Sequence, residues 1–581
     1  MNLLGYGSAS FLAAIMLSGC AYTSADDRSL MEHLAAARAA AQTNADAESY
    51  SQFLVARYAS LINDPDEAAK HYAKVASTLP GDQSIVDRAV FSALLANEFS
   101  LARSISSRAD SPTFASSDLA RLTLATDAIA KGSYSQVPTL LSGEEPSLFN
   151  GLLFNSMRAW ALQGEGRPSE GQLALLDAIS GDRYLDSLIL NMLAIMEVSS
   201  GEDEKAIETF GKIEQAGTLT AVATELYARL LAATGDREKA VAVLDRFRTD
   251  AGPNPLIHAL AVSIEAGDDI DIRRLDAAEG AALSVYIPAA ALASQSQTDL
   301  PGVYYSIALR LDPDLHAARA LWADALDTAG RSQDSIEMLE AIPASSPYFT
   351  SARGQLAWAL RRADENERAL DLVYTTLENN PGRDLKIQMG DLLRSLDRDG
   401  EAEAVFSEVI ASDEAANTAD WRLYYARGAL RESLGQWPLA EADLQTALSL
   451  NPDSPEALNY LGYSWVDRGK NLEEGLDLIR RALTLRPQSG AITDSLGWAH
   501  YKLGNIENAI GYLERAVELE PGVAEINDHL GDAYWAGGRL IEARFQWQRA
   551  ITLLENEDEI DSLQRKMLTG PKPYPVQAQR P

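Results

Sequence analysis

The last third of this sequence carries a ladder of glycines at a nearly fixed interval. Gly428, Gly462, Gly497 and Gly531 are separated by 34, 35 and 34 residues. Further small residues keep the same period, at Gly435, Gly469, Gly504 and Gly538 and again at Ala440, Gly475, Ala509 and Ala543. A period near 34 residues is typical of a stack of helical hairpins, that is, of a solenoid.

The residues between the ladder positions predict the two helices of each hairpin. Small residues such as Gly462 and Gly475 let two antiparallel helices approach closely, while Leu461 and Ile479 fill the space between them. The one extra residue in the ladder falls between Gly469 and Gly475, which predicts that it lies in the turn. Each unit should end before a proline, because proline cannot continue a helix; these prolines are Pro452, Pro487 and Pro521.

One unit matches a known repeat pattern in order, through Leu496-Gly497, Gly504, Ala509, Leu513, Ala516 and Pro521. This pattern resembles the tetratricopeptide repeat family. The resemblance implies an all-α fold, a right-handed superhelical solenoid of helical hairpins. The pattern weakens upstream but persists, for example where Gly201 and Gly235 stand 34 residues apart. Before residue 385, Gly132 and Gly164 fit irregular helical hairpins equally well.

The N-terminal segment predicts export and lipidation. Seven apolar residues at 11–17 are too few to span a bilayer, which needs roughly 20 residues in a helix, but they suit the core of an export signal. Leu17-Ser18-Gly19-Cys20 resembles a bacterial lipobox, in which Cys20 becomes the lipidated first residue, although no Lys or Arg precedes it. Ala21 after the cysteine implies retention at the outer membrane, facing the periplasm. Acyl chains on Cys20 would be the chain's contact with the membrane.

These signals predict five segments along the chain. They are a signal peptide at 1–19, a lipidated cysteine and tether at 20–45, divergent repeats at 46–350, tetratricopeptide repeats at 351–560 with the best matches at 421–555, and a disordered proline-rich tail at 561–581.

Composition and motifs exclude several classes of function. The 84 acidic and 50 basic residues leave a net charge of −34, which disfavours nucleic acid as a partner. The six histidines form no HExxH pair, and neither a Gly-x-Ser-x-Gly elbow nor a phosphate-binding glycine loop occurs. We therefore predict no catalytic residue, no metal site and no cofactor. His500 and His529, near Asp494 and Asp528, are interpreted as packed or solvated histidines.

Three positions in each first helix share one helical face, because they lie three before, one after and four after the ladder glycine. The resemblance implies that this face lines the concave surface of the solenoid. The predicted protein-binding residues there are Asn459, Tyr463, Asp494, Trp498, Tyr501, Asp528, Asp532 and Trp535, with Lys502 beside them. Rings interleaved with carboxylates suit a partner segment that carries apolar and basic or donor groups. The alternative is that these rings pack against the neighbouring repeat.

Residues 459–516 resemble the closing repeats of bacterial tetratricopeptide lipoproteins. One group of these serves a periplasmic carboxy-terminal processing protease by recruiting cell-wall hydrolases for degradation. The resemblance therefore implies a non-enzymatic adaptor with that protease and those hydrolases as partners. Two alternatives stay open, a lipoprotein of polysaccharide export or outer-membrane assembly machinery, and an enzyme with a catalytic part in residues 85–190 or 250–320.

Overall fold

The computed structural model describes residues 47–293 and 299–571, and these residues form helices joined by short turns, with no strand among them. They divide into two compact units, unit 1 up to Ala359 and unit 2 from Leu360 onward. The all-α class and the succession of helical hairpins are confirmed. In both described ranges, every helix is too short or too polar to cross a membrane. Cys20, the predicted signal peptide and the tether lie outside the described residues.

Unit 1 begins with a helix over residues 47–61. Its further helices are α3 (Pro65–Thr78), α4 (Gln83–Leu95), α5 (Phe99–Ser106), α6 (Ser111–Ser116), α7 (Asp118–Ala130), η1 (Tyr134–Gln136), α8 (Val137–Leu140), α9 (Leu148–Gly164), α10 (Pro168–Leu176), α11 (Arg183–Ser200), α12 (Asp203–Ala216), α13 (Ala221–Ala233), α14 (Arg237–Ala251), α15 (Pro255–Ala266), α16 (Ala277–Ala293), α17 (Leu300–Leu311), α18 (His316–Thr328) and α19 (Ser332–Glu340). Helix α20 (Phe349–Arg362) contains the boundary between the units.

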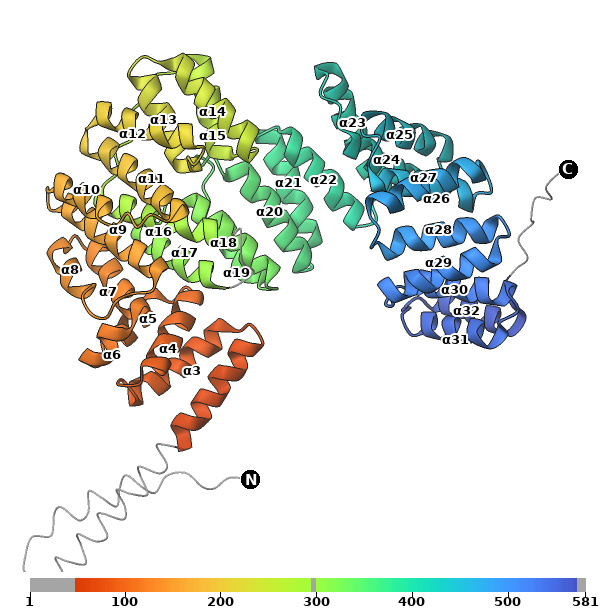
Figure 1. Cartoon of the computed structure of the whole chain (residues 1–581), viewed down its shortest axis with the longest axis horizontal. Helices are drawn as coiled ribbons and strands as arrows, with labels where there is room; N and C mark the ends of the chain where they lie inside the picture. Colours follow the sequence, from red (N-terminus) through yellow and green to blue (C-terminus); the bar gives the residue numbers. More distant parts are fainter. Residues whose placement is uncertain (1–46, 294–298, 572–581) are drawn as a thin grey trace, which may run out of the picture. The chain divides into compact units, whose positions relative to one another are not determined.

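Unit 2 consists of helical hairpins stacked side by side (Figure 1). Its helices are α21 (Asn366–Asn379), α22 (Arg383–Ser395), α23 (Asp399–Ala416), α24 (Trp421–Ser433), α25 (Trp437–Leu450), α26 (Pro455–Asp467), α27 (Leu472–Leu485), α28 (Gly490–Lys502), α29 (Ile506–Leu519), α30 (Ala524–Ala536), α31 (Leu540–Ile551) and α32 (Glu557–Thr569).

The glycine ladders have two different physical causes. A Cβ added to Gly462 would lie 2.8 Å from the carbonyl oxygen of Gly475, and one added to Gly475 would lie 2.8 Å from that of Gly462, so the paired helices touch through their backbones. The second ladder ends the first helix of each hairpin: Gly469 and Gly504 have φ of +65° and +78°, the left-handed conformation that glycine adopts most easily. The extra residue does lie in a turn, where Asn471 also has a positive φ of 46°.

The predicted ends of the second helices are confirmed. Helices α25, α27 and α29 end at Leu450, Leu485 and Leu519, two residues before the three prolines that close the units. The predicted tail at 561–581 is wrong over its first nine residues, because 561–569 belong to α32. Residues 572–581 lie outside the described part of the chain.

Unit 1 departs from a simple stack in which each hairpin contacts only its neighbours. Helices α16 and α17 pack against α9, α7 and α4, which precede them by more than a hundred residues (Figure 1). Trp160 on α9 donates its indole N–H to the hydroxyl of Ser284 on α16 over 2.9 Å, directly above Gly280. Tyr304 on α17 donates its hydroxyl to Asn150 on α9 over 2.9 Å. The segments with the weakest periodicity, 85–190 and 250–320, are therefore the ones that pack on each other.

Candidate functional site

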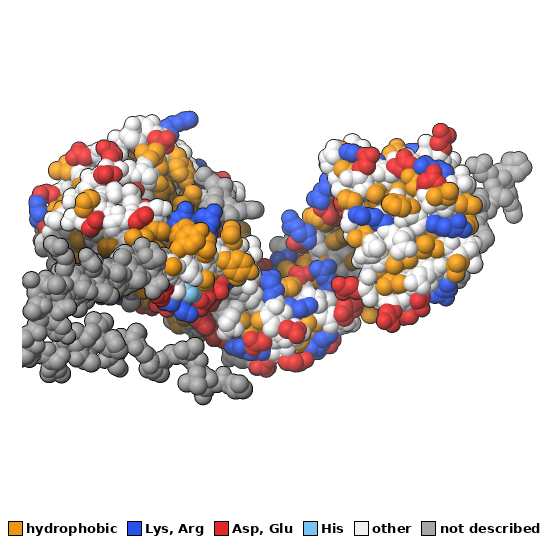
Figure 2. Space-filling view, turned by 90° about the horizontal axis from the view of Figure 1, so that it is seen from below, with side chains coloured by type: hydrophobic (Ala, Val, Ile, Leu, Met, Phe, Trp, Pro, Cys, Tyr) orange, Lys and Arg blue, Asp and Glu red, His pale blue; other side chains and the backbone are white. Residues whose placement is uncertain are grey.

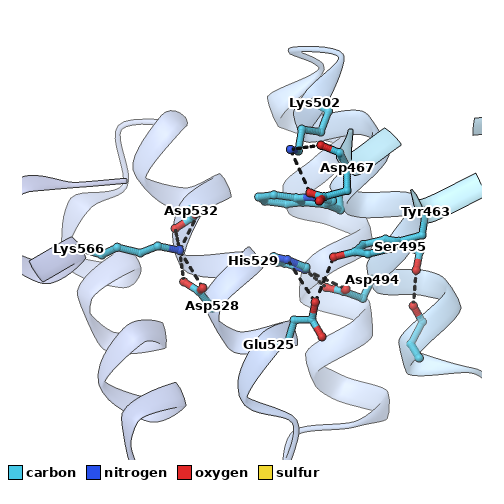
Figure 3. Close-up of polar contacts among 12 residues, drawn as sticks. Tyr463, Asp467, Asp494, Ser495, Lys502, Glu525, Asp528, His529, Asp532 and Lys566 are labelled. Carbon is cyan, nitrogen blue, oxygen red and sulfur yellow. Dashed lines mark hydrogen bonds and ion pairs between the residues drawn. The ribbon is translucent and has the colours of Figure 1, made fainter. Parts of the chain in front are cut away.

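The predicted binding residues all lie on α26, α28 and α30, the first helices of three successive hairpins of unit 2. We call the surface formed by α24, α26, α28 and α30 the first-helix face. These helices are neighbours, and Tyr463 on α26 reaches past α28 to donate its hydroxyl to Glu525 on α30 over 3.1 Å (Figure 3). Burial and the nearby carboxylates of Glu525 and Asp467 raise the pKa of Tyr463, which keeps this hydroxyl protonated as a donor.

Trp498 is the centre of the site, and it is buried with only 5% of its surface exposed. Its ring stacks on Tyr501 and on His529, with ring centroids 4.8 Å and 4.0 Å away. Its indole N–H points to Asp467 at 3.3 Å, and Lys502 also contacts that carboxylate at 3.2 Å. Trp498 and Lys502 therefore pack between repeats. For Trp498 this is the alternative interpretation, in which the rings pack against the neighbouring repeat.

His529 and Asp494 form a buried ion pair between α30 and α28, with 2.9 Å between His529 Nδ1 and Asp494 Oδ2 (Figure 3). Burial alone would lower the pKa of His529, but the Asp494 carboxylate outweighs it and raises that pKa to about 9. Glu525, 3.9 Å from Nε2, acts in the same direction. The Asp494 carboxylate is thus paired with His529 within the fold, and His529 is a packed, charged histidine.

The pH dependence of this ion pair gives a testable expectation. Because the pKa of His529 is raised from 6.5 to about 9, its contribution to stability is complete below about pH 6.5 and is lost as the pH rises through 9. We expect hydrogen exchange in α28 and α30 to speed up between pH 7 and pH 10 beyond the intrinsic pH effect. His529→Gln should remove this excess. An imidazole resonance of His529 that titrates near 6.5 would contradict the assignment.

Asp528, Asp532 and Trp535 on α30 are covered by α32, which the sequence analysis did not predict. Lys566 on α32 lies 2.7 Å from both oxygens of Asp528 and 3.1 Å from both oxygens of Asp532 (Figure 3). Burial raises the pKa of Asp532 to about 6, with the Asp528 carboxylate adding to the effect. A Cβ on Gly570 would lie 2.5 Å from the Trp535 ring, so the chain after α32 passes directly over that indole.

What the first-helix face leaves accessible is a run of half-buried rings bordered by carboxylates. The half-buried rings are Trp421, Tyr425, Tyr460, Tyr463 and Tyr501. The first three of these rings approach one another, with 6.5 Å between the centroids of Trp421 and Tyr425 and 5.7 Å between those of Tyr425 and Tyr460. The side chains of Glu525 and Asp467 are 65% and 47% exposed beside them. Asn459 lies on this face too, and its Oδ1 is buried without a hydrogen-bond partner.

The arrangement suits binding of a peptide segment by stacking and charge, because aromatic rings bury much area and exposed carboxylates attract basic groups.

Over residues 47–293 and 299–571 no group of three or more His, Cys, Asp or Glu residues is placed to hold a metal ion. On the face of unit 2 seen in Figure 2, hydrophobic side chains are interspersed with charges of both signs. Sequence reasoning missed Asp467 and Glu525, which a search for acidic residues flanking the ring positions would have found.

Comparison with known proteins finds tetratricopeptide repeats in the C-terminal part of the chain. The family model "Tetratricopeptide repeat" matches residues 425–490 and 495–556, which are the hairpins that carry the site. The chain is 39% identical over 85 residues to the TPR repeat-containing protein PA4667 of Pseudomonas aeruginosa, a match that covers 15% of this chain and 14% of that protein. The chain thus spans about one seventh of the length of this relative.

Two solved structures align with parts of this chain at low TM-scores. The Cut9–Hcn1 hetero-tetramer of the APC/C aligns with a TM-score of 0.37 and 15% identity, over 91% of this chain and 98% of that one. A tetratricopeptide repeat protein from Parabacteroides merdae aligns with a TM-score of 0.37 and 16% identity, over 44% of this chain and 98% of that one.

Proposed function

We propose that this chain is a non-enzymatic scaffold that binds protein segments on the first-helix face of unit 2. The observation that carries the proposal is the set of half-buried rings between Trp421 and Tyr501. Beside them lie the exposed carboxylate of Glu525 and the half-exposed carboxylate of Asp467, which Lys502 contacts. Tetratricopeptide repeats suggest protein partners in general. A segment with apolar and basic side chains fits these rings and charges, whereas the net charge of −34 disfavours nucleic acid.

Site-specific photo-crosslinking tests this surface. A photoreactive phenylalanine at Tyr463, on the first-helix face, should crosslink a partner in cells. The matched control is the same residue at Tyr512 on α29, a tyrosine of the same unit that is 37% exposed. Glu525→Lys should lower the crosslinking yield at Tyr463 several-fold, because it reverses an exposed charge beside the ring. Equal crosslinking from Tyr463 and Tyr512 would contradict the proposal.

We further propose that Cys20 anchors the protein to the outer membrane, with the described residues in the periplasm. The support is the lipobox-like Leu17-Ser18-Gly19-Cys20 after a short apolar core. Cys20→Ala should move the protein from the membrane fraction to the soluble or unprocessed fraction, because each buried methylene of an acyl chain contributes about 0.8 kcal/mol. Ser18→Ala serves as a control that keeps the thiol. Equal recovery of the wild type and Cys20→Ala in membranes would rule the anchor out.

The particular pathway we propose is delivery of cell-wall hydrolases to a periplasmic carboxy-terminal processing protease. Its support is the resemblance of residues 459–516 to the adaptor lipoproteins. A tagged full-length chain should co-purify with the protease from solubilised membranes, and Glu525→Lys should reduce the amount of hydrolase that accompanies it. Co-purification of polysaccharide-export or outer-membrane assembly proteins instead would replace this pathway.

A further inference from the structure

Helix α32 packs along α31, and Arg544 donates a hydrogen bond to the carbonyl of Met567, but α32 buries few of its own side chains against unit 2. Of its side chains only Leu563 is buried, and Ile560, Lys566 and Met567 are half-buried. Leu563 joins the apolar cluster formed by α29, α30 and α31, and Met567 packs against its edge. The remaining nine residues of the helix are exposed. This small burial contrasts with α30, in which Leu530, Ala533 and Tyr534 are all buried.

The strongest polar contact of α32 is Lys566 between the two carboxylates of α30. Its Nζ lies within 3.1 Å of all four oxygens of Asp528 and Asp532. Asp532 also accepts the indole N–H of Trp547 over 3.1 Å, which fixes the carboxylate in place. A basic side chain is needed here, since two neighbouring carboxylates that are largely buried repel each other without one.

The preceding junction between hairpins pairs its carboxylate with a more deeply buried cation. Asp494 precedes Asp528 by one repeat, and its cation is His529, supplied by the next first helix. Asp528 receives its cation from α32 instead. The difference is burial: His529 is 9% exposed in its side chain, whereas Lys566 is 23% exposed at the edge of the unit.

We propose that α32 is a displaceable occupant, and that the surface of Asp528, Asp532 and Trp535 docks a helix of a protein partner. This α30 surface would take a helix with a lysine three residues after a leucine, the spacing of Leu563 and Lys566. If a lysine of the partner helix replaces Lys566, Asp528 and Asp532 stay paired with a cation, so electrostatic repulsion does not oppose the exchange. Departure of α32 would also uncover the Trp535 ring, on which Gly570 now lies. The inference rests on the proposed scaffold function and extends its binding face by one repeat.

Hydrogen exchange of the full-length wild type is the first test. Because a displaceable helix opens without the rest of the unit, amides of 557–569 should exchange roughly 100-fold faster than those of α30. Equal protection of α32 and α30 would show that α32 is a fixed part of the fold and would overturn the proposal.

Binding of a labelled synthetic peptide of residues 557–571 to full-length variants is the second test. Leu563→Ala with Lys566→Ala should weaken the attachment of α32 and raise the affinity for the peptide about tenfold or more over wild type. Arg565→Ala, which removes an exposed cation from the same helix, should leave it unchanged. Adding Asp528→Asn and Asp532→Asn to the double variant should abolish peptide binding.

Two outcomes of the peptide experiment would overturn the proposal. One is no gain in peptide affinity in a double variant whose α32 amides exchange freely. The other is formation of a dimer that the Asp528→Asn and Asp532→Asn changes abolish, which would make the occupant the α32 of a second copy. Crosslinking at Tyr463 separates this inference from the scaffold function: a partner captured there without peptide binding at the α30 surface would remove only the inference.

Discussion

Asp443→Ala should destabilise unit 2 by about 3–5 kcal/mol, the cost of removing one partner from a buried ion pair. Asp443 on α25 is buried and accepts two hydrogen bonds from Arg427, over 2.7 Å and 2.8 Å, and one from Arg431 over 2.8 Å. Both arginines lie on α24 and are largely buried. Without Asp443, two guanidinium groups face each other with Glu403 as the nearest compensating charge, bound to Arg431.

The control for this prediction is an exposed aspartate of the same unit. Asp384 contacts Arg383 at 3.4 Å but is 85% exposed, so Asp384→Ala should cost at most about 1 kcal/mol. Asp443→Asn should retain the shape and part of the hydrogen bonding, and it should fall between the two. Native-state hydrogen exchange of α24 and α25 measures the loss without assuming that a repeat array unfolds in one step. A loss no larger for Asp443→Ala than for Asp384→Ala would contradict the prediction.

The fold of unit 2 could be predicted from the sequence because its determinants recur locally. Gly462 and Gly475 mark where the backbones touch, Gly469 marks the end of a first helix, and Pro487 follows the end of a second. Each of these requirements is met within one hairpin or between neighbours. A period of 34 residues therefore predicts both where the helices end and which positions pack closely.

The packing of α16 and α17 in unit 1 could not be predicted in this way. The hydrogen bond from Trp160 to Ser284 joins residues 124 apart in the sequence, and no period connects them. Gly280 is small because the Trp160 ring lies against it, but a single glycine in an alanine-rich segment gives no sign of its distant partner. These weakly periodic segments pack on each other as well as on their sequence neighbours.

The sequence predicts the helical face that the candidate residues share, but not the contacts that they make. The spacing around Gly497 places Asp494, Trp498 and Tyr501 on one face, as observed. It gives no information on what the next helix supplies, and His529 and Lys566 occupy the carboxylates that were expected to face a partner. Helix α32 was missed because its polar, acidic start and single buried leucine resemble a solvated tail.

Trp498→Ala should also destabilise unit 2 by about 3–5 kcal/mol, the usual cost of truncating a buried aromatic side chain. The substitution removes the stacking partner of both His529 and Tyr501 and the donor to Asp467. Trp421→Ala removes a half-buried ring from the same face and should cost clearly less. Hydrogen exchange in α28 and α30 reports the loss. A stable Trp498→Ala variant would show that the ring contributes little to packing.

Trp498→Phe separates packing from direct contact with a partner. The phenyl ring can stack on His529 and Tyr501, so most of the stability should remain, although the hydrogen bond to Asp467 is lost. Because Trp498 is 5% exposed, a partner on the first-helix face would contact mainly its neighbours. Crosslinking from Tyr463 should therefore be retained in a folded Trp498→Phe variant. If the folded variant loses that crosslink, the indole itself contacts the partner, and the face must open around Trp498 when the partner binds.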